Sequence, residues 1–587
     1  MLFRVGRADE QAPSSGMTHL VEHLALPAQS RRRISFNGTV DNVMTVFWAS
    51  GDEAQVRTFL ETTARSLSAL PLERLETERQ ILLAEEATEG SSLTRLAFSL
   101  RYGSVGHGLT GYSQYGLRRL TADDVSARAA AHFTRGNLAI WLTGPETGDL
   151  QLELPPGVRH LPPEPWTIPE VVDSLPSLYR GGRPGAIGFS LDAERSIAFR
   201  VGLSVLRHRA QDRIRFELGL SYEVESVFVP LTADRVHAVI VTDASEQNAS
   251  RISAEMLEML NALATEGPTE AELEDELFDA RQYAADPTEL TSQLYYAAAQ
   301  HLFGDADSHA RTYLAEQERL MSADVARAMD EARKTLLAIV PETVESLPGL
   351  TDYPVTSPGV IANGRRFRPP GLRVRRSADD SELVVGEEGV MITAGAHFRV
   401  TVPYDRCTVA LRYADGERVL LSDDGFFATV RPDDWKQGRE AVAAIDAAVP
   451  PALVAVMDPE LSEQVDSVED AANEKLKRRW TVSDELALLP GRLEPGERVV
   501  TMCEAARGMR LGLLAVTDRR VIFCALIHKE TWLEFGYDEI ESVKGQSNLW
   551  RTAVTVRARG EKLVFSDVAP KARALEIAAE IESRLLR

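Results

Sequence analysis

Two histidines and a glutamate near the start of the chain are spaced as a metal site requires. His19, Glu22 and His23 lie in the run GMTHLVEHLAL. On a helix, residues four apart face the same side about one turn apart, so both imidazoles can reach one ion. Neutral imidazole is a good zinc ligand, and a carboxylate beside the ion is suited to act as a general base. The run therefore predicts a hydrolytic zinc site on a helix.

The alternative for this run is an amphipathic core helix that happens to carry two histidines. Leu20, Val21, Leu24 and Leu26 give the run the apolar character of such a helix. The chain has 11 histidines in 587 residues. A chance H-x-x-E-H in such a chain has a probability of roughly a few per cent. The motif alone is therefore a hypothesis.

A candidate third ligand lies in an acidic helix further along the chain, LERLETERQILLAEEATEG. Its apolar residues recur at helical spacing, and Glu78 and Glu85, two turns apart, share one face. A catalytic zinc ion usually keeps three protein ligands and one water. The alternative is an ordinary acidic helix face in contact with solvent.

Together these segments resemble the insulinase and pitrilysin family of zinc peptidases, peptidase family M16, which includes the mitochondrial processing peptidase. In that family one helix carries H-x-x-E-H, the inverzincin pattern, and a later helix carries E-R-x-x-x-x-x-E, matched here by ERQILLAE. The resemblance implies that one zinc ion per chain is bound by His19, His23 and Glu85. It also implies that Glu22 is the catalytic base and that Glu78 is a supporting catalytic residue.

Two further segments resemble the substrate-binding parts of the same family. NGTVDNVMTVFW, which starts at Asn37, fits the family's strand beside the cleft, with Asn37 and Thr45 at its polar positions. An extended peptide can pair with such a strand. RFELGLSYEVES fits R-x-x-x-G-L-x-Y, which implies that Arg215 and Tyr222 hold substrate carbonyls as hydrogen-bond donors. The alternative is a surface ion pair at Arg215 and a packed strand residue at Tyr222.

The chain contains an internal repeat. RRLTADDV at residues 118–125 recurs as ERLMSADV at residues 318–325. Similarity at this spacing indicates a duplicated domain, each copy with a largely antiparallel sheet covered by helices. The second copy has no H-x-x-E-H, so we expect one copy to carry the metal and the other to shape the cleft. In the family two such halves enclose a chamber, which implies a second chain, as a homodimer or a second insulinase-like subunit.

The remaining residues, from about residue 377, differ from the duplicated part. Short alternating runs are typical of strands, and a terminal amphipathic helix follows them. LAVTDRRVIF followed by FGYDEIESV is similar to bacterial pleckstrin-homology-like (PH-like) domains. The segment before it is a candidate for a second such domain. No basic cluster favours lipid binding, so we expect these domains to mediate protein–protein contact.

The predicted fold class is α+β, with two homologous insulinase-type domains followed by one or two mainly-β PH-like domains. The expected parts are an N-terminal zinc domain at 1–165, a second insulinase-type domain at 166–350, a candidate PH-like domain at 377–455, a helical linker at 456–480 and a PH-like domain at 481–587. Compared with the family, the chain begins inside the first strand of the zinc domain.

Composition narrows the function further. The net charge of −23 argues against a nucleic-acid binder, and no apolar run has the length of a membrane span. The three cysteines have neither the spacing of a metal site nor that of a disulfide framework. We therefore expect them to be small residues of the core, in a protein of a reducing, cytoplasmic compartment. Usage rich in Ala, Arg and Asp is typical of a GC-rich bacterial source. The sequence predicts a zinc-dependent endopeptidase acting on extended or unfolded peptides; the alternative is a catalytically inactive peptide-binding scaffold with PH-like interaction modules.

Overall fold

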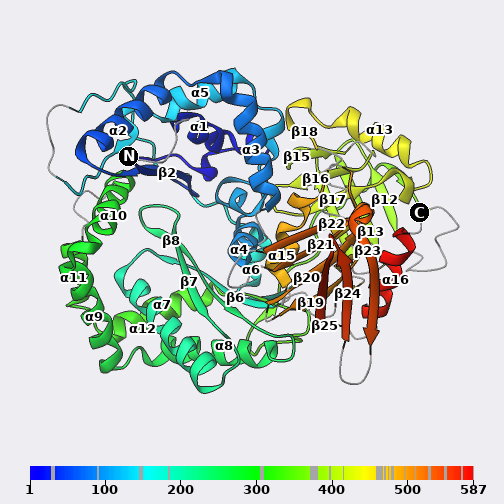
Figure 1. Ribbon diagram of the computed structural model, residues 1–587. Helices are drawn as coiled ribbons and strands as arrows, with labels where there is room; N and C mark the ends of the chain where they lie inside the picture. The colour runs from blue at the N-terminus through cyan, green and yellow to red at the C-terminus, as the bar shows by residue number, and fades with distance from the viewer. Residues whose placement is uncertain are drawn as a thin grey trace. The chain divides into compact units, whose positions relative to one another are not determined.

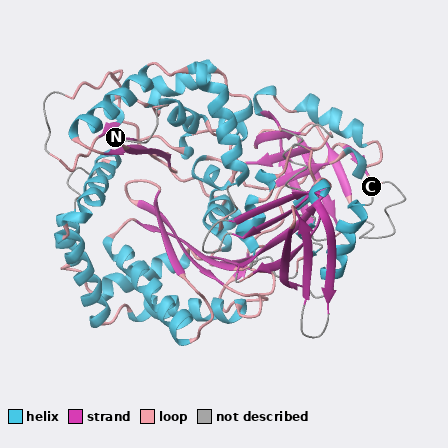
Figure 2. Ribbon diagram, viewed as in Figure 1, coloured by secondary structure: helices cyan, strands magenta, loops and turns pink. Residues whose placement is uncertain are grey.

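Figures 1 and 2 show the fold, which is that of a computed structural model. The structure describes all residues except 28–33, 89–91, 145–149, 183–184, 305–309, 370–380, 396–397, 414–415, 458–466, 469–470, 473–474, 477–481, 495, 509, 526–530, 548–551, 570–572 and 586–587. The chain divides into two compact units. The first comprises residues 1–82 and 92–456, and the second comprises residues 83–91 and 457–587.

The first half, residues 1–165, is built on a four-stranded antiparallel sheet with the order β2-β3-β1-β4. Its strands are β1 (Leu2–Phe3), β2 (Ser35–Val40), β3 (Thr45–Ser50) and β4 (Leu138–Ala139). Its helices are α1 (Met17–Ala25), α2 (Glu53–Ser68), α3 (Leu75–Thr88), α4 (Leu93–Tyr102) and α5 (Ala122–His132). Helix α1, which carries the histidines, packs against α2, α5 and β2.

The second half, residues 166–352, has a six-stranded sheet with the order β10-β5-β9-β6-β8-β7. Its strands are β5 (Ser177–Arg180), β6 (Ala186–Glu194), β7 (Val224–Pro230), β8 (Arg235–Asp243), β9 (Leu337–Val340) and β10 (Thr351–Asp352). Its helices are α6 (Pro169–Ser174), α7 (Ile197–Ala210), α8 (Ala249–Glu266), α9 (Glu270–Ala285), α10 (Leu290–Phe303), α11 (Ala310–Gln317) and α12 (Ser322–Lys334).

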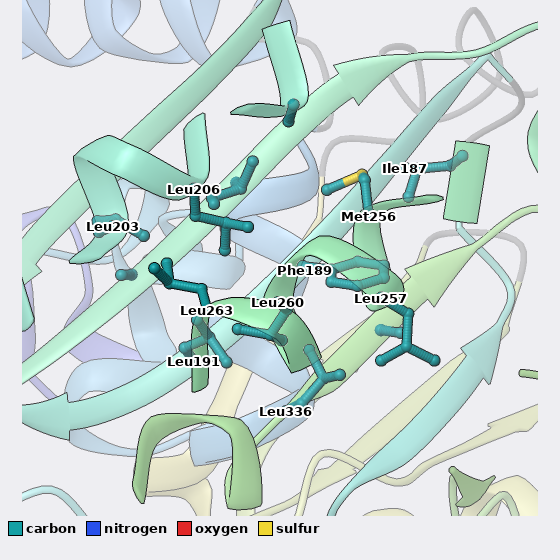
Figure 3. Packing of buried hydrophobic residues seen from close by; sticks show 14 of the residues in the cluster. Ile187, Phe189, Leu191, Leu203, Leu206, Met256, Leu257, Leu260, Leu263 and Leu336 are labelled. Atoms are coloured by element: carbon teal, nitrogen blue, oxygen red, sulfur yellow. The ribbon is translucent and has the colours of Figure 1, made fainter. Parts of the chain in front are cut away.

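Figure 3 shows the core of this second half. Phe189 and Leu191 of β6, Leu203 of α7 and Leu260 of α8 are buried members of one hydrophobic cluster. The residues that β6 contributes to this cluster are two apart, as on one face of a strand, and those of α8 recur at helical spacing, so the helix covers this face of the sheet.

The sheet orders confirm the predicted duplication. The order β9-β6-β8-β7 in the second half repeats β4-β1-β3-β2 in the first half, strand for strand. The repeated sequence starts equivalent helices: Asp124 accepts the backbone N–H of Thr121 at 2.8 Å before α5, and Asp324 accepts that of Met321 at 3.2 Å before α12. An acidic side chain that binds the free N–H groups at a helix start favours helix formation there.

The two halves exchange equivalent helices, which the sequence did not predict (Figure 1). Helix α4 of the first half packs on β6, β8 and β9 of the second half, where Leu93 meets Ile339. Helix α10 of the second half packs on β1 and β4, where Leu302 joins the cluster that holds Leu2 and Val46. Each sheet therefore depends on a helix from the other half.

The third module, residues 365–456, has two four-stranded sheets, ordered β11-β12-β13-β14 and β17-β16-β15-β18, around a shared core. Its elements are β11 (Arg365–Phe367), β12 (Glu382–Val385), β13 (Gly389–Ala394), β14 (Phe398–Pro403), β15 (Cys407–Arg412), β16 (Arg418–Ser422), β17 (Phe427–Val430), α13 (Gly438–Ala448) and β18 (Val454–Val456). Strand β11 pairs with β12, so the module includes a strand before the expected start at residue 377.

The second unit has a seven-stranded antiparallel sheet with the order β22-β21-β20-β19-β25-β24-β23. Its elements are α15 (Ser483–Leu488), β19 (Val499–Arg507), β20 (Arg510–Thr517), β21 (Arg520–Ala525), β22 (Thr531–Gly536), β23 (Ile540–Ser547), β24 (Thr552–Ala558), β25 (Glu561–Ala569) and α16 (Arg573–Leu585). Ile577 and Ile581 of α16 pack with Phe523 and Phe565, so the terminal helix caps the sheet, as predicted.

The expected helical linker at 456–480 lies largely outside the described residues. Those of its residues that are described include Val468, Ala472 and Leu476, which are buried against Met502 and Ile522 of the sheet. These described residues therefore belong to the core of the second unit.

Two expectations from composition also have structural outcomes. Cys407, Cys503 and Cys524 are free and buried, and burial raises the pKa of the Cys503 thiol to about 12, so they are core residues as predicted. Among the helices that the structure describes, none is long and apolar enough to cross a membrane.

Candidate metal centre

Helix α1 has a fixed starting point. Gly16, just before the helix, has φ of +91°, a left-handed conformation that favours glycine, and a Cβ there would lie 2.7 Å from the side chain of Leu117. The carboxylate of Glu10 accepts the N–H groups of Gly16 at 2.8 Å and Thr18 at 2.7 Å. An anion at a helix N-terminus is stabilising. These contacts set the direction in which the histidines project.

His19, Glu22 and His23 lie on one side of α1, with their ligand atoms all within 4.8 Å of one another. Oε2 of Glu22 is 3.8 Å from Nε2 of His19 and 3.6 Å from Nε2 of His23. Each histidine side chain is 16% exposed, so an ion can reach both rings. The predicted juxtaposition of the three residues is therefore present, and no other such group occurs among the described residues.

The second nitrogen of each histidine is held by a side-chain oxygen. Nδ1 of His19 is 3.1 Å from Oε1 of Gln114, and Nδ1 of His23 is 3.1 Å from Oε2 of Glu78. Because these oxygens accept, each neutral ring carries its proton on Nδ1 and keeps a lone pair on Nε2. Histidines that bind metals almost always have such a partner on the other nitrogen. Both Nε2 atoms are thus prepared for a metal ion.

Glu78 is buried and is itself held in place. Its Oε1 pairs with the guanidinium of Arg74, which also donates to the backbone oxygen of Leu26 at 3.0 Å. Leu26 follows the last residue of α1, so Arg74 ties the start of α3 to the end of α1. The supporting role expected for Glu78 is, in this geometry, the orientation of His23.

His19 is neutral at physiological pH. Burial, followed by the nearby charges of His23 and Arg7, lowers the pKa of His19 to about 3, and the hydrogen bond with Gln114 opposes this only in part. A neutral ring is the form that binds metal, so this site holds His19 ready as a ligand.

Glu22 is buried against the neighbouring strand. A Cβ added at Gly38 on β2 would overlap Oε1 of Glu22, so the strand passes the carboxylate at a distance that only glycine allows. Oε2 of the same carboxylate faces the two histidines. Gly38 therefore makes room for Glu22 in the orientation that a general base requires.

Glu85, expected to be the third ligand, is not part of the compact group. It lies on α3, two turns beyond Glu78, which corresponds to about 10 Å along the helix axis, and its side chain is exposed. Its role as a ligand stays a prediction.

Asn37 is exposed on β2 and pairs in register with Trp48 of β3. Strand β2 is at the edge of the first sheet, as the order β2-β3-β1-β4 shows. An edge strand offers unpaired backbone groups to an extended peptide. Thr45 is buried, and its hydroxyl donates to the backbone oxygen of Val5 at 2.8 Å, so it supports the sheet.

Arg215 and Tyr222 come together on the second half. Helix α7 continues into a π-helical turn, Gln211–Glu217, of a kind often found at functional sites, and this turn carries Arg215. The guanidinium lies 5.0 Å from the ring centre of Tyr222 and 5.1 Å from that of Phe216. Tyr222 is 73% exposed, so it is not the packed strand residue considered as an alternative, and within the described residues Arg215 has no ion pair.

The loop that carries Tyr222 is organised by one carboxylate. Asp243, at the end of β8, accepts the backbone N–H groups of Tyr222 at 2.9 Å and Glu223 at 3.0 Å, and the hydroxyl of Ser221 at 2.7 Å. This fixes the loop while leaving the tyrosine ring in solvent.

Sequence reasoning missed Gln114, Gly38 and Asp243. Gln114 is 95 residues from His19, and no motif joins the two. Gly38 had a usable signal, because a glycine inside a strand pattern often marks a close approach of another group.

Two parts of the chain match known families. Residues 184–277, in the second half, match the Peptidase M16 inactive domain, and residues 493–582 match the Bacterial PH domain. Both matches agree with the resemblances seen in the sequence. No curated protein has a sequence that matches this chain.

Several solved structures are similar to the chain. The peptidase M16 inactive domain from Pseudomonas fluorescens has 15% identity and a TM-score of 0.46, with 60% of this chain and 93% of that chain covered. A protease from Helicobacter pylori has 17% identity and a TM-score of 0.48, with coverage of 58% and 92%. The periplasmic protease PqqL from Escherichia coli has 13% identity and a TM-score of 0.43, with coverage of 67% and 52%.

Proposed function

We propose that the chain is a zinc-dependent endopeptidase of the insulinase type, which hydrolyses extended or unfolded peptides in a chamber formed with a second chain. The observation that carries this proposal is the orientation of His19 and His23. Both Nδ1 atoms are hydrogen-bonded to side-chain oxygens, and both Nε2 atoms lie beside Oε2 of Glu22. A core helix that carries histidines by chance has no need of this arrangement.

The donor set fits zinc. Neutral imidazole nitrogens and a carboxylate are ligands of catalytic zinc sites, and each histidine side chain is 16% exposed, so both rings are accessible from solvent. His19 and His23 would hold the ion. We propose Glu85 as the third ligand, the position that the resemblance to the family implies. Bound zinc supplies a Lewis acid and lowers the pKa of water.

Glu22 has the position of a general base. Its buried carboxylate takes a proton from the attacking water and returns it to the leaving amine, which needs one oxygen directed at the reacting centre. Oε2 meets this need, while Oε1 rests against Gly38. The close fit to β2 restricts the carboxylate to this orientation.

The substrate we propose is an extended peptide that pairs with the edge strand β2. Asn37 on this strand and the donors of Arg215 and Tyr222 would bind backbone groups of the peptide. The exposure of Tyr222 and the absence of an ion pair at Arg215 among the described residues support this role.

We further propose that a second chain completes the chamber, either as a homodimer or as another insulinase-like subunit. The PH-like domain would serve protein–protein contact. The three free, buried cysteines support a reducing, cytoplasmic compartment.

A second candidate function is a peptide-binding scaffold without catalysis. It is favoured by the absence of Glu85 from the group of three, which leaves two histidines and Glu22 as the described donors. In that case the histidines bind zinc for structure or not at all.

Glu22→Gln separates the two functions. The amide keeps the size of the side chain but cannot accept the proton, so we expect zinc content to stay at one ion per chain and cleavage of a quenched fluorescent peptide library to fall by 100-fold or more, on the order of the contribution of a general base. The control is Glu53→Gln, which changes an exposed glutamate at the start of α2.

Zinc content and turnover are measured together. Wild-type chain that binds zinc but cleaves no peptide, with or without a chelator, identifies the scaffold. Cleavage by the Glu22→Gln variant at the wild-type rate contradicts the role given to Glu22.

A further inference from the structure

Residues 112–120, here called the strap, connect the metal centre to distant parts of the first unit. They run from Tyr112 to Leu120, include the short 3-10 helix η5 (Tyr115–Arg118) and lead into α5. The described structure gives this segment contacts with the helix of the histidines, with α3 and with the third module. Each contact is considered below.

The strap holds the start of α1 and its first histidine. Gln114 is buried, and its Oε1 is 3.1 Å from Nδ1 of His19. Leu117 packs on Gly16, where an added Cβ would lie 2.7 Å away. Gly116 lies so close to Ser14 that an added Cβ would be 2.5 Å from the backbone carbon of that residue. The position of His19 thus depends on the position of the strap.

The strap also binds α3. Arg79, the residue after Glu78, donates to the backbone oxygen of Leu117 and, at 2.7 Å, to that of Leu120. Its side chain is almost fully covered. Since Glu78 orients His23, the strap contacts the helices that support both histidines.

The third module is hydrogen-bonded to the strap through Arg119. The guanidinium donates to the backbone oxygens of Ala452 at 2.6 Å and Val454 at 3.2 Å, beside and within β18. Strand β18 contacts η5, and the preceding 3-10 helix η10 (Pro451–Leu453) contacts η2 (Ala12–Ser14), which precedes α1. The module therefore meets both segments that flank the metal centre.

A second contact anchors the chain ahead of the strap. Ser104 is fully buried, and its hydroxyl is 2.6 Å from the hydroxyl of Thr408 and donates to the backbone oxygen of Ser422 at 2.8 Å. A Cβ at Gly103, which has φ of +60°, would overlap the backbone oxygen of Asp423. The module thus fixes the chain before the strap, at residues 103–104, and within it, at Arg119.

We propose that the third module positions the metal centre, and that Arg119 is the positioning residue through which it acts. By holding the strap, the module keeps Gln114 against His19 and Arg79 against the strap, so that both Nε2 atoms stay aligned. This inference rests on the proposed function, because it concerns the same site. It gives the module a part in the chemistry, in addition to the interaction role expected from its sequence.

The test uses the full chain with Arg119→Gln, Arg119→Lys and the control Arg159→Gln. Arg159 is also an exposed arginine that donates to a distant backbone oxygen, that of His301 at 3.1 Å, but it lies outside the strap. Three quantities are measured: zinc affinity by competition with a chelator, the visible spectrum of the chain loaded with Co²⁺, and hydrogen–deuterium exchange of residues 112–120.

We expect Arg119→Gln to weaken zinc binding about tenfold, in the range known for residues that support metal ligands. The Co²⁺ spectrum changes, and exchange in the strap becomes faster. Arg119→Lys recovers part of the affinity because it keeps one donor, and Arg159→Gln leaves all three quantities unchanged. Ser104→Ala removes the hydrogen bonds that hold the chain ahead of the strap, and we expect it to weaken zinc binding as well. This variant replaces Arg119→Gln in the test if Arg119→Gln folds poorly.

Arg119→Gln with faster strap exchange but wild-type affinity and an unchanged Co²⁺ spectrum overturns this inference. It leaves the proposed function intact. A wild-type chain that binds neither Zn²⁺ nor Co²⁺ overturns the proposed function itself, and the inference with it.

Discussion

Two oxygen atoms that are not metal ligands decide how the histidines of α1 face. Gln114 and Glu78 each bind an Nδ1 atom, so the Nε2 atoms of His19 and His23 point to the same place as the carboxylate of Glu22. The sequence motif predicts which residues form the group, because helical spacing fixes their common side. It does not predict Gln114, whose contact with His19 arises only when segments far apart in the chain fold together.

Gly38→Ala tests whether the close fit of β2 positions Glu22. The added methyl group overlaps Oε1, so the carboxylate must move away from the histidines. We expect kcat to fall roughly 100-fold, since a displacement of about 1 Å at a reacting group can have this effect. Zinc affinity should change much less than kcat, because the three atoms nearest the new methyl group all belong to Glu22 and not to a histidine.

The matched control for this change is Gly188→Ala. Gly188 also lies within a strand, β6, but an added Cβ there has its nearest neighbour at 3.4 Å, an ordinary packing distance. Steady-state kinetics and metal titration are compared for both variants. A Gly38→Ala chain that keeps the wild-type kcat shows that Glu22 needs no glycine beside it.

At the scale of elements, the sequence predicts what depends on local patterns. It does not predict that α4 and α10 pack on the sheet of the other half. The repeat at residues 118–125 and 318–325 predicted the duplication, and its two copies begin the equivalent helices α5 and α12. The helices α4 and α10 were not assigned to the opposite halves, because an apolar helix face does not specify which sheet will cover it. Long-range packing of this kind leaves no periodic signal in the sequence.

The start of the second unit also depends on packing that the sequence pattern does not reveal. The match to the family model starts at residue 493, yet Val468, Leu486 and Leu489 cover one face of the sheet. A fragment of residues 493–587 therefore exposes buried residues such as Met502 and Ile522. We expect it to aggregate and to bind an apolar dye, whereas residues 457–587 should be monomeric and should melt cooperatively.

Size-exclusion chromatography and thermal melting of both fragments check this expectation. A monomeric fragment 493–587 with the same melting temperature as 457–587 would show that the preceding segment contributes nothing to the core.

At the scale of the whole first unit, a buried polar cluster joins the two halves. Asp192 of β6 accepts hydrogen bonds from the hydroxyl of Tyr102 at 2.6 Å and from Nδ1 of His237 at 2.7 Å, with Arg101 of α4 nearby. Burial favours a raised pKa for Asp192, but Arg101 and the two hydrogen bonds outweigh it and hold that pKa well below its usual range. Burial lowers the pKa of His237.

Both shifts make the junction sensitive to acid. Below about pH 6.5 the unfolded chain binds a proton at His237 that the folded chain does not bind, so the free energy of unfolding falls as the pH falls. The lowered pKa of Asp192 has an effect of the same sign. Its contribution to the free energy of unfolding is lost as the pH falls below 3.8.

His237→Asn isolates the first effect, because the amide can still donate to Asp192 but does not titrate. Between pH 6 and 5 we expect the wild type to lose up to about 1.4 kcal/mol more stability per pH unit than the variant, the value for one proton. Denaturant titrations at several pH values measure the difference. Parallel curves for the two proteins would assign the acid sensitivity to other groups.

The exchange of α4 and α10 also constrains the order in which the first unit can fold during its synthesis. The sheet beside His19 and His23 lacks one of its covering helices until Leu290–Phe303 has been synthesised. Most of the second half must therefore be translated before the first half can complete its core. The three residues of the candidate metal centre lie early in the sequence, yet the fold around them is completed late.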